Sequence, residues 1–73
     1  MKEILATSKL LFGSSIEIEK GNIVYWKDGI YSENWQSWTI NIYKKEGEEY
    51  VRIGIVPCRE FSREVQRMQD KKQ

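Results

Sequence analysis

The feature that most constrains the fold is a pair of alternating segments separated by a short polar stretch. Apolar and polar residues alternate in residues 37–43 and again in residues 50–55, which predicts two half-buried strands. Residues 45–48 between them have turn composition. Pairing Tyr43 with Tyr50 places one set of large apolar residues on a single side of the hairpin. The opposed pairs are then Ile42 with Val51, Ile40 with Ile53 and Trp38 with Ile55.

A second hairpin is predicted before the first. Residues 16–19 alternate, residues 20–22 have turn composition, and residues 23–26 are β-branched and aromatic. Asp28-Gly29 predicts another chain reversal. The polar stretch 32–36 fits a loop or an irregular start of the next strand.

The C-terminal segment predicts an amphipathic helix. Pro57 suits the end of a strand and the first turn of a helix, and the helical pattern extends to about Lys72. At 100° per residue, one arc of this helix is apolar and the side nearly opposite is basic. The apolar arc holds Cys58, Phe61, Val65 and Met68, and the basic side holds Arg59, Arg63 and Arg67.

Residues 3–12 leave two alternatives open. Their apolar residues fit a short helix stopped by Gly13 and fit equally a strand that leads into a turn at residues 13–15. Lys, Glu, Leu and Ala in this stretch favour the helix slightly.

Together these elements predict one α+β domain over residues 1–73. It consists of a small antiparallel sheet of about four to five strands with the C-terminal amphipathic helix packed on one face. This architecture is similar to several small scaffolds, including coactivator domains that bind single strands. No family motif accompanies it, so no site is carried over. A chain of 73 residues buries only about 60% of its unfolded surface, which favours association into a homodimer.

Composition excludes several classes of function. The chain has no histidine and a single cysteine, so it lacks the commonest general base, the commonest metal ligand and any internal disulfide. Cys58 lies on the apolar arc and is interpreted as a small buried hydrophobe. Glu17 and Glu19 are interpreted as a solvated strand face. We therefore expect no enzyme, no cofactor and no metal site.

Hydropathy indicates a soluble protein. No apolar run approaches the ~18 residues of a membrane-spanning helix, and polar residues interrupt residues 4–12, unlike the core of a signal peptide. The absence of disulfides is typical of a reducing compartment. We expect a cytoplasmic protein without a membrane partner.

Aromatic and basic residues are segregated along the chain. Seven of the nine aromatic residues lie within residues 25–50, and all four arginines lie within residues 51–73. In that last segment six basic residues oppose three acidic ones, so its net charge is +3. This distribution directs the search for a binding site to the sheet and the helix.

The second side of the main hairpin is the strongest candidate site. Its predicted residues are Trp35, Thr39, Asn41, Tyr43, Tyr50 and Arg52, with Trp35 included if the alternation extends back that far. Planar rings on a sheet stack on unpaired bases, and arginines bind phosphates, so Arg59, Arg63 and Arg67 would add supporting charge. Aromatic residues are common in strands whatever the function, and charged helix faces are usually just solvated.

Two functions therefore remain open. The first is a non-enzymatic module that binds single-stranded nucleic acid through the aromatic sheet face and the basic helix. The second is a protein-interaction module, such as a homodimer, a small inhibitor or an accessory protein, that uses the surplus aromatic surface or a sheet edge.

Overall fold

The computed structural model describes residues 1–70, which form six strands and one helix. In chain order these are β1 (Lys2–Leu5), β2 (Leu10–Phe12), β3 (Ile16–Ile18), β4 (Ile23–Ser32), β5 (Ser37–Glu46), β6 (Glu49–Pro57) and α1 (Cys58–Asp70). The predicted α+β class, with an antiparallel sheet and a C-terminal helix on one of its faces, is confirmed. The helix begins directly after Pro57, and its predicted extension to Lys72 lies outside the described residues.

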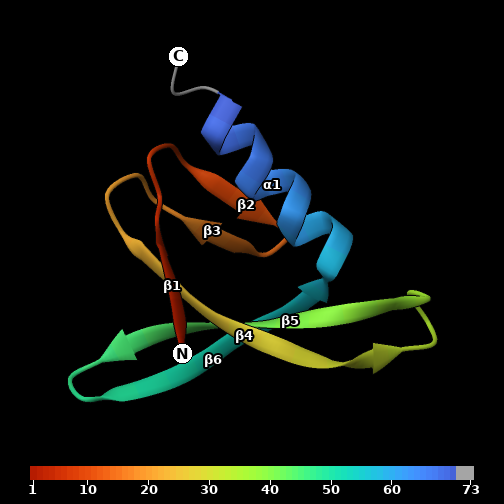
Figure 1. The fold of residues 1–73 in the computed structure, drawn as a ribbon. Coiled ribbons are helices and arrows are strands. Elements are labelled where there is room, and N and C mark those ends of the chain that lie inside the picture. The colour runs from red at the N-terminus through yellow and green to blue at the C-terminus, as the bar shows by residue number, and fades with distance from the viewer. Residues whose placement is uncertain (71–73) are drawn as a thin grey trace.

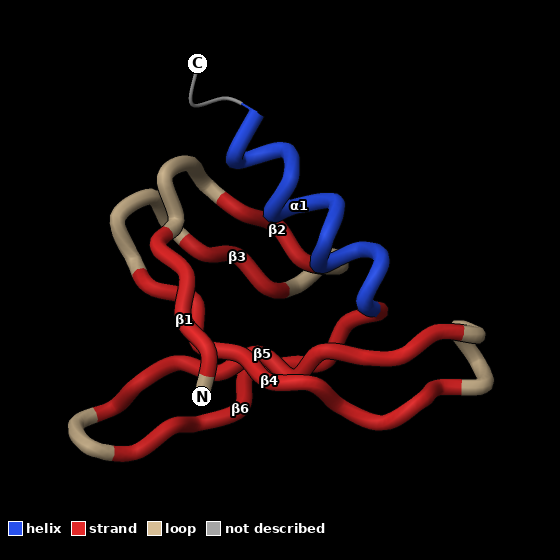
Figure 2. The backbone as a smooth tube through the Cα atoms, viewed as in Figure 1, coloured by secondary structure: helices blue, strands red, loops and turns tan. Residues whose placement is uncertain are grey.

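The elements form two layers (Figures 1 and 2). The lower layer is a four-stranded antiparallel sheet in the order β1-β4-β5-β6. The upper layer holds the two-stranded sheet β2-β3 and, beside it, α1. Both upper elements lie on the same face of the larger sheet. Its other face, which we call the outer face, is covered by no other element of the described chain.

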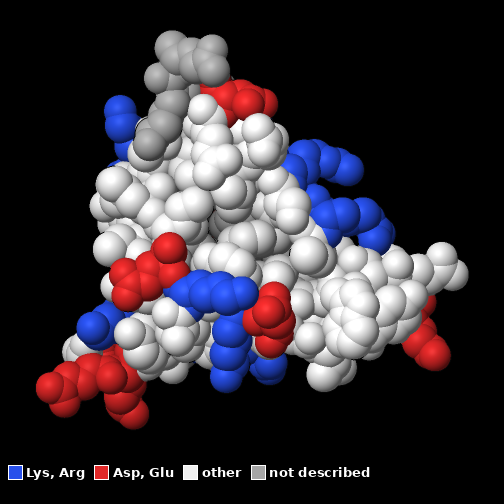
Figure 3. Space-filling model, viewed as in Figure 1, with Lys and Arg blue, Asp and Glu red and all other residues white. Residues whose placement is uncertain are grey.

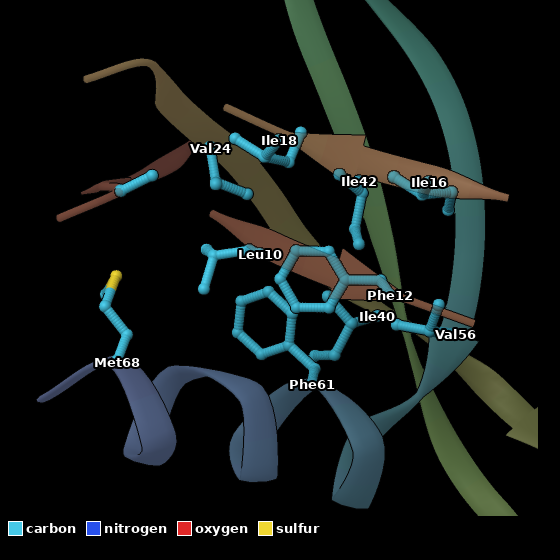
Figure 4. Packing of buried hydrophobic residues seen from close by; sticks show 11 residues of the cluster. Leu10, Phe12, Ile16, Ile18, Val24, Ile40, Ile42, Val56, Phe61 and Met68 are labelled. Carbon is cyan, nitrogen blue, oxygen red and sulfur yellow. The ribbon is translucent and has the colours of Figure 1, made fainter. Parts of the chain in front are cut away.

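The hydrophobic core fills the space between the layers (Figure 4). The small sheet contributes Leu10, Phe12, Ile16 and Ile18, the large sheet Val24, Ile40, Ile42 and Val56, and the helix Phe61 and Met68. The Phe61 ring lies 5.3 Å from the ring of Phe12 and 4.8 Å from that of Trp26. Aromatic contacts at these distances stabilise beyond simple area burial. Phe61 therefore connects both layers.

The N-terminal segment adopts the strand alternative. β1 pairs with β4, and β2 pairs with β3, both antiparallel. Between these strands the backbone of Ala6 remains paired, because its N–H donates to the Asn22 carbonyl and its carbonyl accepts from Gly21. The slight helical preference of residues 3–12 is overridden by tertiary packing, which buries alternate side chains such as Leu10 and Phe12.

The predicted second hairpin is wrong. Residues 20–22 do reverse the chain, but β3 pairs with β2 rather than with β4, so the two strands enter different sheets. The expected reversal at Asp28-Gly29 is also wrong, because β4 continues through a bulge to Ser32. The chain turns instead at residues 33–36, where Gln36 has a φ of 51°. The loop alternative for this stretch is therefore correct.

The register predicted for the main hairpin is wrong as well. The turn is a two-residue connection at Gly47 and Glu48, in which Gly47 has the positive φ of 64° that such tight hairpin turns require. Tyr50 consequently faces Lys45 rather than Tyr43.

A bulge at Ile53 then changes which residues of β6 face the core. Ile42 faces Gly54, and Ile40 faces Val56. Val56 enters the core because the extra residue reverses the alternation, whereas Ile55 turns to the outer face.

The predicted buried side of the hairpin is therefore half correct. Ile40 and Ile42 are buried, and Ile53 packs against the core. Val51, like Ile55, is exposed, since it lies near the turn at the free end of the hairpin. Trp38 is 62% exposed, because its end of β5 projects beyond the helix (Figure 1).

The helix also closes one edge of the small sheet. The Glu64 carboxylate accepts a 3.0 Å hydrogen bond from the Leu11 N–H, and the Glu60 carboxylate accepts one from the Gly13 N–H. The Arg67 guanidinium donates to the Lys9 carbonyl at 2.7 Å. These backbone groups lie on the side of β2 that does not face β3. The helix side chains thus replace a missing strand at an edge that would otherwise be open to pairing.

Candidate nucleic-acid interface

The outer face collects three tyrosines from three neighbouring strands. Tyr25 of β4 lies opposite Tyr43 of β5, and Tyr50 of β6 lies opposite Lys45. Directly opposed residues of an antiparallel pair point to the same side of a sheet. The same rule adds Lys27 and Asn41, which oppose each other, and Arg52, which opposes Tyr43. Figure 3 shows basic side chains projecting from this lower side of the molecule, where β4, β5 and β6 cross.

Rings and cations alternate across this face. The rings of Tyr25 and Tyr50 meet edge to face, with centroids 5.2 Å apart. The Lys27 ammonium lies 5.6 Å from the centre of the Tyr43 ring, and the Lys45 ammonium lies 5.7 Å from that of Tyr50. A cation at this distance is attracted to the ring face. Each tyrosine is therefore close to another ring or to a positive charge.

Arg52 and Asn41 add hydrogen-bonding groups to the same surface. The Arg52 Nη1 donates to the Asn41 Oδ1 at 3.3 Å. A guanidinium carries five N–H donors, so one contact of this kind leaves others directed at solvent. Arg52 can thus bind an anion without losing its contact to Asn41.

The outer face is positively charged although the whole chain carries only +1. Within residues 1–70 its cations are Lys27, Lys45 and Arg52, and the register of β1 adds one acidic group, Glu3, opposite Tyr25. The acidic residues 46–49 lie at the end of the β5–β6 hairpin. One of the lysines there is neutralised, because Lys44 forms a 2.8 Å ion pair with Glu46.

A pocket of about 440 Å³ lies between β3 and one end of the large sheet, on the side opposite the outer face. Tyr25, Tyr43 and Lys45 contribute to its wall, and β3 contributes Glu17. Lys9 pairs with Glu17 at 3.6 Å. The mixed charges of this wall make it less suited to a phosphate than the open sheet beside it.

Four of the predicted site residues share the outer face, and two others do not. Asn41, Tyr43, Tyr50 and Arg52 lie on it. Trp35 lies in the loop between β4 and β5. Thr39 is only 2% exposed, because the bulge of β4 covers it and its Oγ1 donates to the Ile30 carbonyl at 2.6 Å. Thr39 therefore stabilises the bulge and is closed to a ligand.

The arginines of the helix lie on the opposite side of the molecule from the tyrosines. Arg59 and Arg63 are exposed on α1, which packs on the other face of the sheet. Arg67 is held by Glu64 at 2.7 Å and by the Lys9 carbonyl. The hydrogen bond to Glu64 raises the pKa of the Arg67 guanidinium. The predicted stripe of three arginines is thus reduced to two, and the structure does not bring them together with the sheet residues.

Sequence reasoning missed Tyr25, Lys27 and Lys45. The sequence predicts Tyr25 within a separate hairpin and Lys27 after it, and that pairing puts neither residue beside β5. The sequence predicts Lys45 in the turn, whereas the tighter turn at Gly47 extends β5 to Glu46. Two signals together would have placed these three residues on the outer face. One is the two-residue turn that begins with Gly47, and the other is a β4 that continues for ten residues.

No family model, no curated protein and no solved structure matches this chain. No helix within residues 1–70 is long and apolar enough to cross a membrane. In that same part of the chain, no group of three or more acidic or cysteine side chains lies close enough to hold a metal ion.

Proposed function

We propose that this protein is a non-enzymatic module that binds single-stranded nucleic acid through the outer face of its four-stranded sheet. The observation that carries the proposal is the alternation of tyrosine rings and cations on a sheet face that no other described element covers. The residues assigned to binding are Tyr25, Lys27, Asn41, Tyr43, Lys45, Tyr50 and Arg52.

The chemistry of this face suits an unpaired strand. A ring that stacks on a base contributes about 1–3 kcal/mol, and it reaches the base only where the bases are unpaired. Cations spaced between the rings neutralise the phosphates that follow each base. A sheet face also holds its rings at fixed separations, so little conformational freedom is lost on binding.

The direct test is a titration of a fluorescently labelled oligothymidine of about 15 nucleotides, followed by anisotropy. The label belongs on the nucleic acid because Trp26 and Trp38 point to the helix side and Trp35 lies in a loop. Three neutralised phosphates predict a salt slope of about −2 on logarithmic axes, so affinity falls roughly 20-fold between about 50 and 200 mM salt. Absence of binding at the lower salt concentration would overturn the proposal.

Substitutions at one ring separate stacking from charge. Tyr43→Ala should weaken binding at least roughly five-fold, whereas Tyr43→Phe keeps the ring and should bind nearly as well as the parent. Tyr31→Ala is the matched control, because Tyr31 is an exposed tyrosine outside the outer-face set. Binding that falls equally in Tyr31→Ala and Tyr43→Ala would place the nucleic acid elsewhere. Each variant is first shown to unfold cooperatively, so that lost binding reports the contact.

A further inference from the structure

The end of the β4–β5 hairpin is aromatic and almost uncharged. Within residues 29–40, which we call the hairpin tip, Glu33 is the one charged residue, although 32% of the whole chain is charged. Ile30 is 74% exposed, Trp38 62%, Tyr31 46% and Trp35 39%. Figure 3 shows this tip as a broad uncharged area. A low share of charged residues, together with exposed aromatic residues, is typical of the centre of a protein interface.

An apolar groove lies beside the tip, between α1 and the large sheet. It encloses about 310 Å³. Trp26 and Ile40 line it from the sheet, and Cys58 and Val65 line it from the helix. Asp28 also lines it, next to its register partner Ile40, and the next pair along the same face is Tyr31 with Trp38. The rings of that pair meet edge to face at 5.5 Å. Groove and tip therefore form one continuous strip on the helix side of the sheet.

The helix wall of this groove is bordered by two arginines. Ser62 and Gln66 line the groove, and at 100° per residue Arg59 and Arg63 are the next positions around the helix toward solvent. Both arginines are exposed, and no hydrogen bond or ion pair of either is found among the described residues. In Figure 3 basic groups project from α1 above the uncharged tip. The groove is thus apolar inside and positive at its rim.

We infer that a second copy of this chain occupies the groove, with the hairpin tip of each protomer inserted into the groove of the other. Each copy carries both complementary parts: an aromatic tip with one negative charge and an apolar groove with a positive rim. In the pair, Glu33 of one protomer meets Arg59 and Arg63 of its partner. Such reciprocal contact is the ordinary form of a two-fold dimer.

Two features of the molecule support a second copy rather than a nucleic acid at this surface. The walls are mainly apolar, and the one charged wall residue within residues 1–70, Asp28, is already paired with Lys2 at 3.5 Å, so the wall offers a phosphate no cation of its own. A 73-residue chain also has little core of its own, and burial of the tip would supply apolar contact that the monomer lacks. The tyrosines of the outer face point away from this strip, so the inferred dimer is independent of the proposed function.

Sedimentation of the full chain tests the inference, with loading from sub-micromolar to near-millimolar concentrations. We expect a monomer–dimer equilibrium and a concentration-dependent blue shift of tryptophan emission, because Trp35 and Trp38 leave water on association. Trp38→Ser removes an exposed ring and should weaken the dimer about 30-fold without unfolding the monomer. A protein that stays monomeric at every concentration, or that assembles beyond a dimer, would overturn the inference.

Charge reversal tests the pairing itself. Glu33→Arg should weaken the dimer roughly ten-fold, as should Arg59→Glu combined with Arg63→Glu, because each places like charges together. The triple variant should recover most of the lost affinity. Lys20→Glu is the matched control, since Lys20 lies in the turn between β3 and β4, away from groove and tip. A dimer that is unchanged by Glu33→Arg, or not restored in the triple variant, would show that another surface forms the contact.

Discussion

Both faces of the large sheet carry aromatic rings, but the rings on the two faces have different surroundings. On the helix side, the Trp26 ring packs against Phe61, and the rings of Phe61 and Phe12 stack at an interplanar angle of 17°. On the outer face, ammonium groups lie near the rings of Tyr43 and Tyr50, and Tyr50 is 40% exposed. Aromatic content alone therefore does not locate a core. Packing against the buried Phe61 makes Trp26 a core ring although the Lys2 ammonium lies 4.6 Å from it, so a neighbouring charge alone does not mark a ring as available to a ligand.

Truncating a ring on each face gives the largest contrast. Phe61→Ala should destabilise the protein by about 3–5 kcal/mol, because it opens a cavity between both layers. Tyr50→Ala should cost about 1 kcal/mol or less, since Tyr50 is 40% exposed. Urea denaturation followed by circular dichroism measures both.

A domain of this size has little stability to lose, so Phe61→Ala is compared with the milder Phe61→Leu. The leucine variant should remain folded and lose about 1–2 kcal/mol. A loss of unfolding free energy in Tyr50→Ala that exceeds the loss in Phe61→Leu would contradict the distinction between the two faces.

The bulge of β6 offers a smaller test of how closely the upper layer packs. A Cβ added at Gly54 would overlap the Cδ1 of Ile16, so Gly54→Ala should cost about 1–3 kcal/mol. Ile16→Val removes that methyl group and alone should cost about 0.5–1.5 kcal/mol. In the double variant the alanine should add little further cost, a coupling that a double-mutant cycle of unfolding free energies measures. Simple additivity would contradict the close approach of β3 to the bulge.

The smallest expected effect concerns the edge of β2, which the helix covers. Glu64→Ala removes the acceptor of the Leu11 N–H. Hydrogen exchange of that amide should become roughly five-fold faster, which corresponds to about 1 kcal/mol in the free energy of local opening. Glu48→Ala, in the exposed turn, should leave the Leu11 amide unchanged. An unaltered exchange rate in Glu64→Ala would mean that the carboxylate does not close this edge.

The sequence predicts the elements of this fold better than it predicts their pairing. Pro57 and the apolar arc from Cys58 define the helix, because both signals are local. The partner of β3 is not local: the same alternation suits β2 or β4, and the choice is decided by how Leu10 and Phe12 reach the core.

The candidate site was partly predictable for the same reason. Tyr43, Tyr50 and Arg52 follow from alternation, although their correct register required the tight turn at Gly47. Thr39 could not be excluded from sequence, because the bulge that covers it depends on Gly29 and its neighbour in another strand. A bulge adds one residue without an evident change of pattern, and it reverses every inside-outside assignment that follows.

Binding at the outer face is tested most directly by mapping backbone amide shifts of the ¹⁵N-labelled protein as an unlabelled oligothymidine is added at low salt. We expect the largest changes at Tyr25, Asn41, Tyr43 and Tyr50, and little change at the amides of α1 around Arg59 and Arg63. Changes concentrated on α1, or no changes at any amide, would contradict the assignment of the outer face as the nucleic-acid interface.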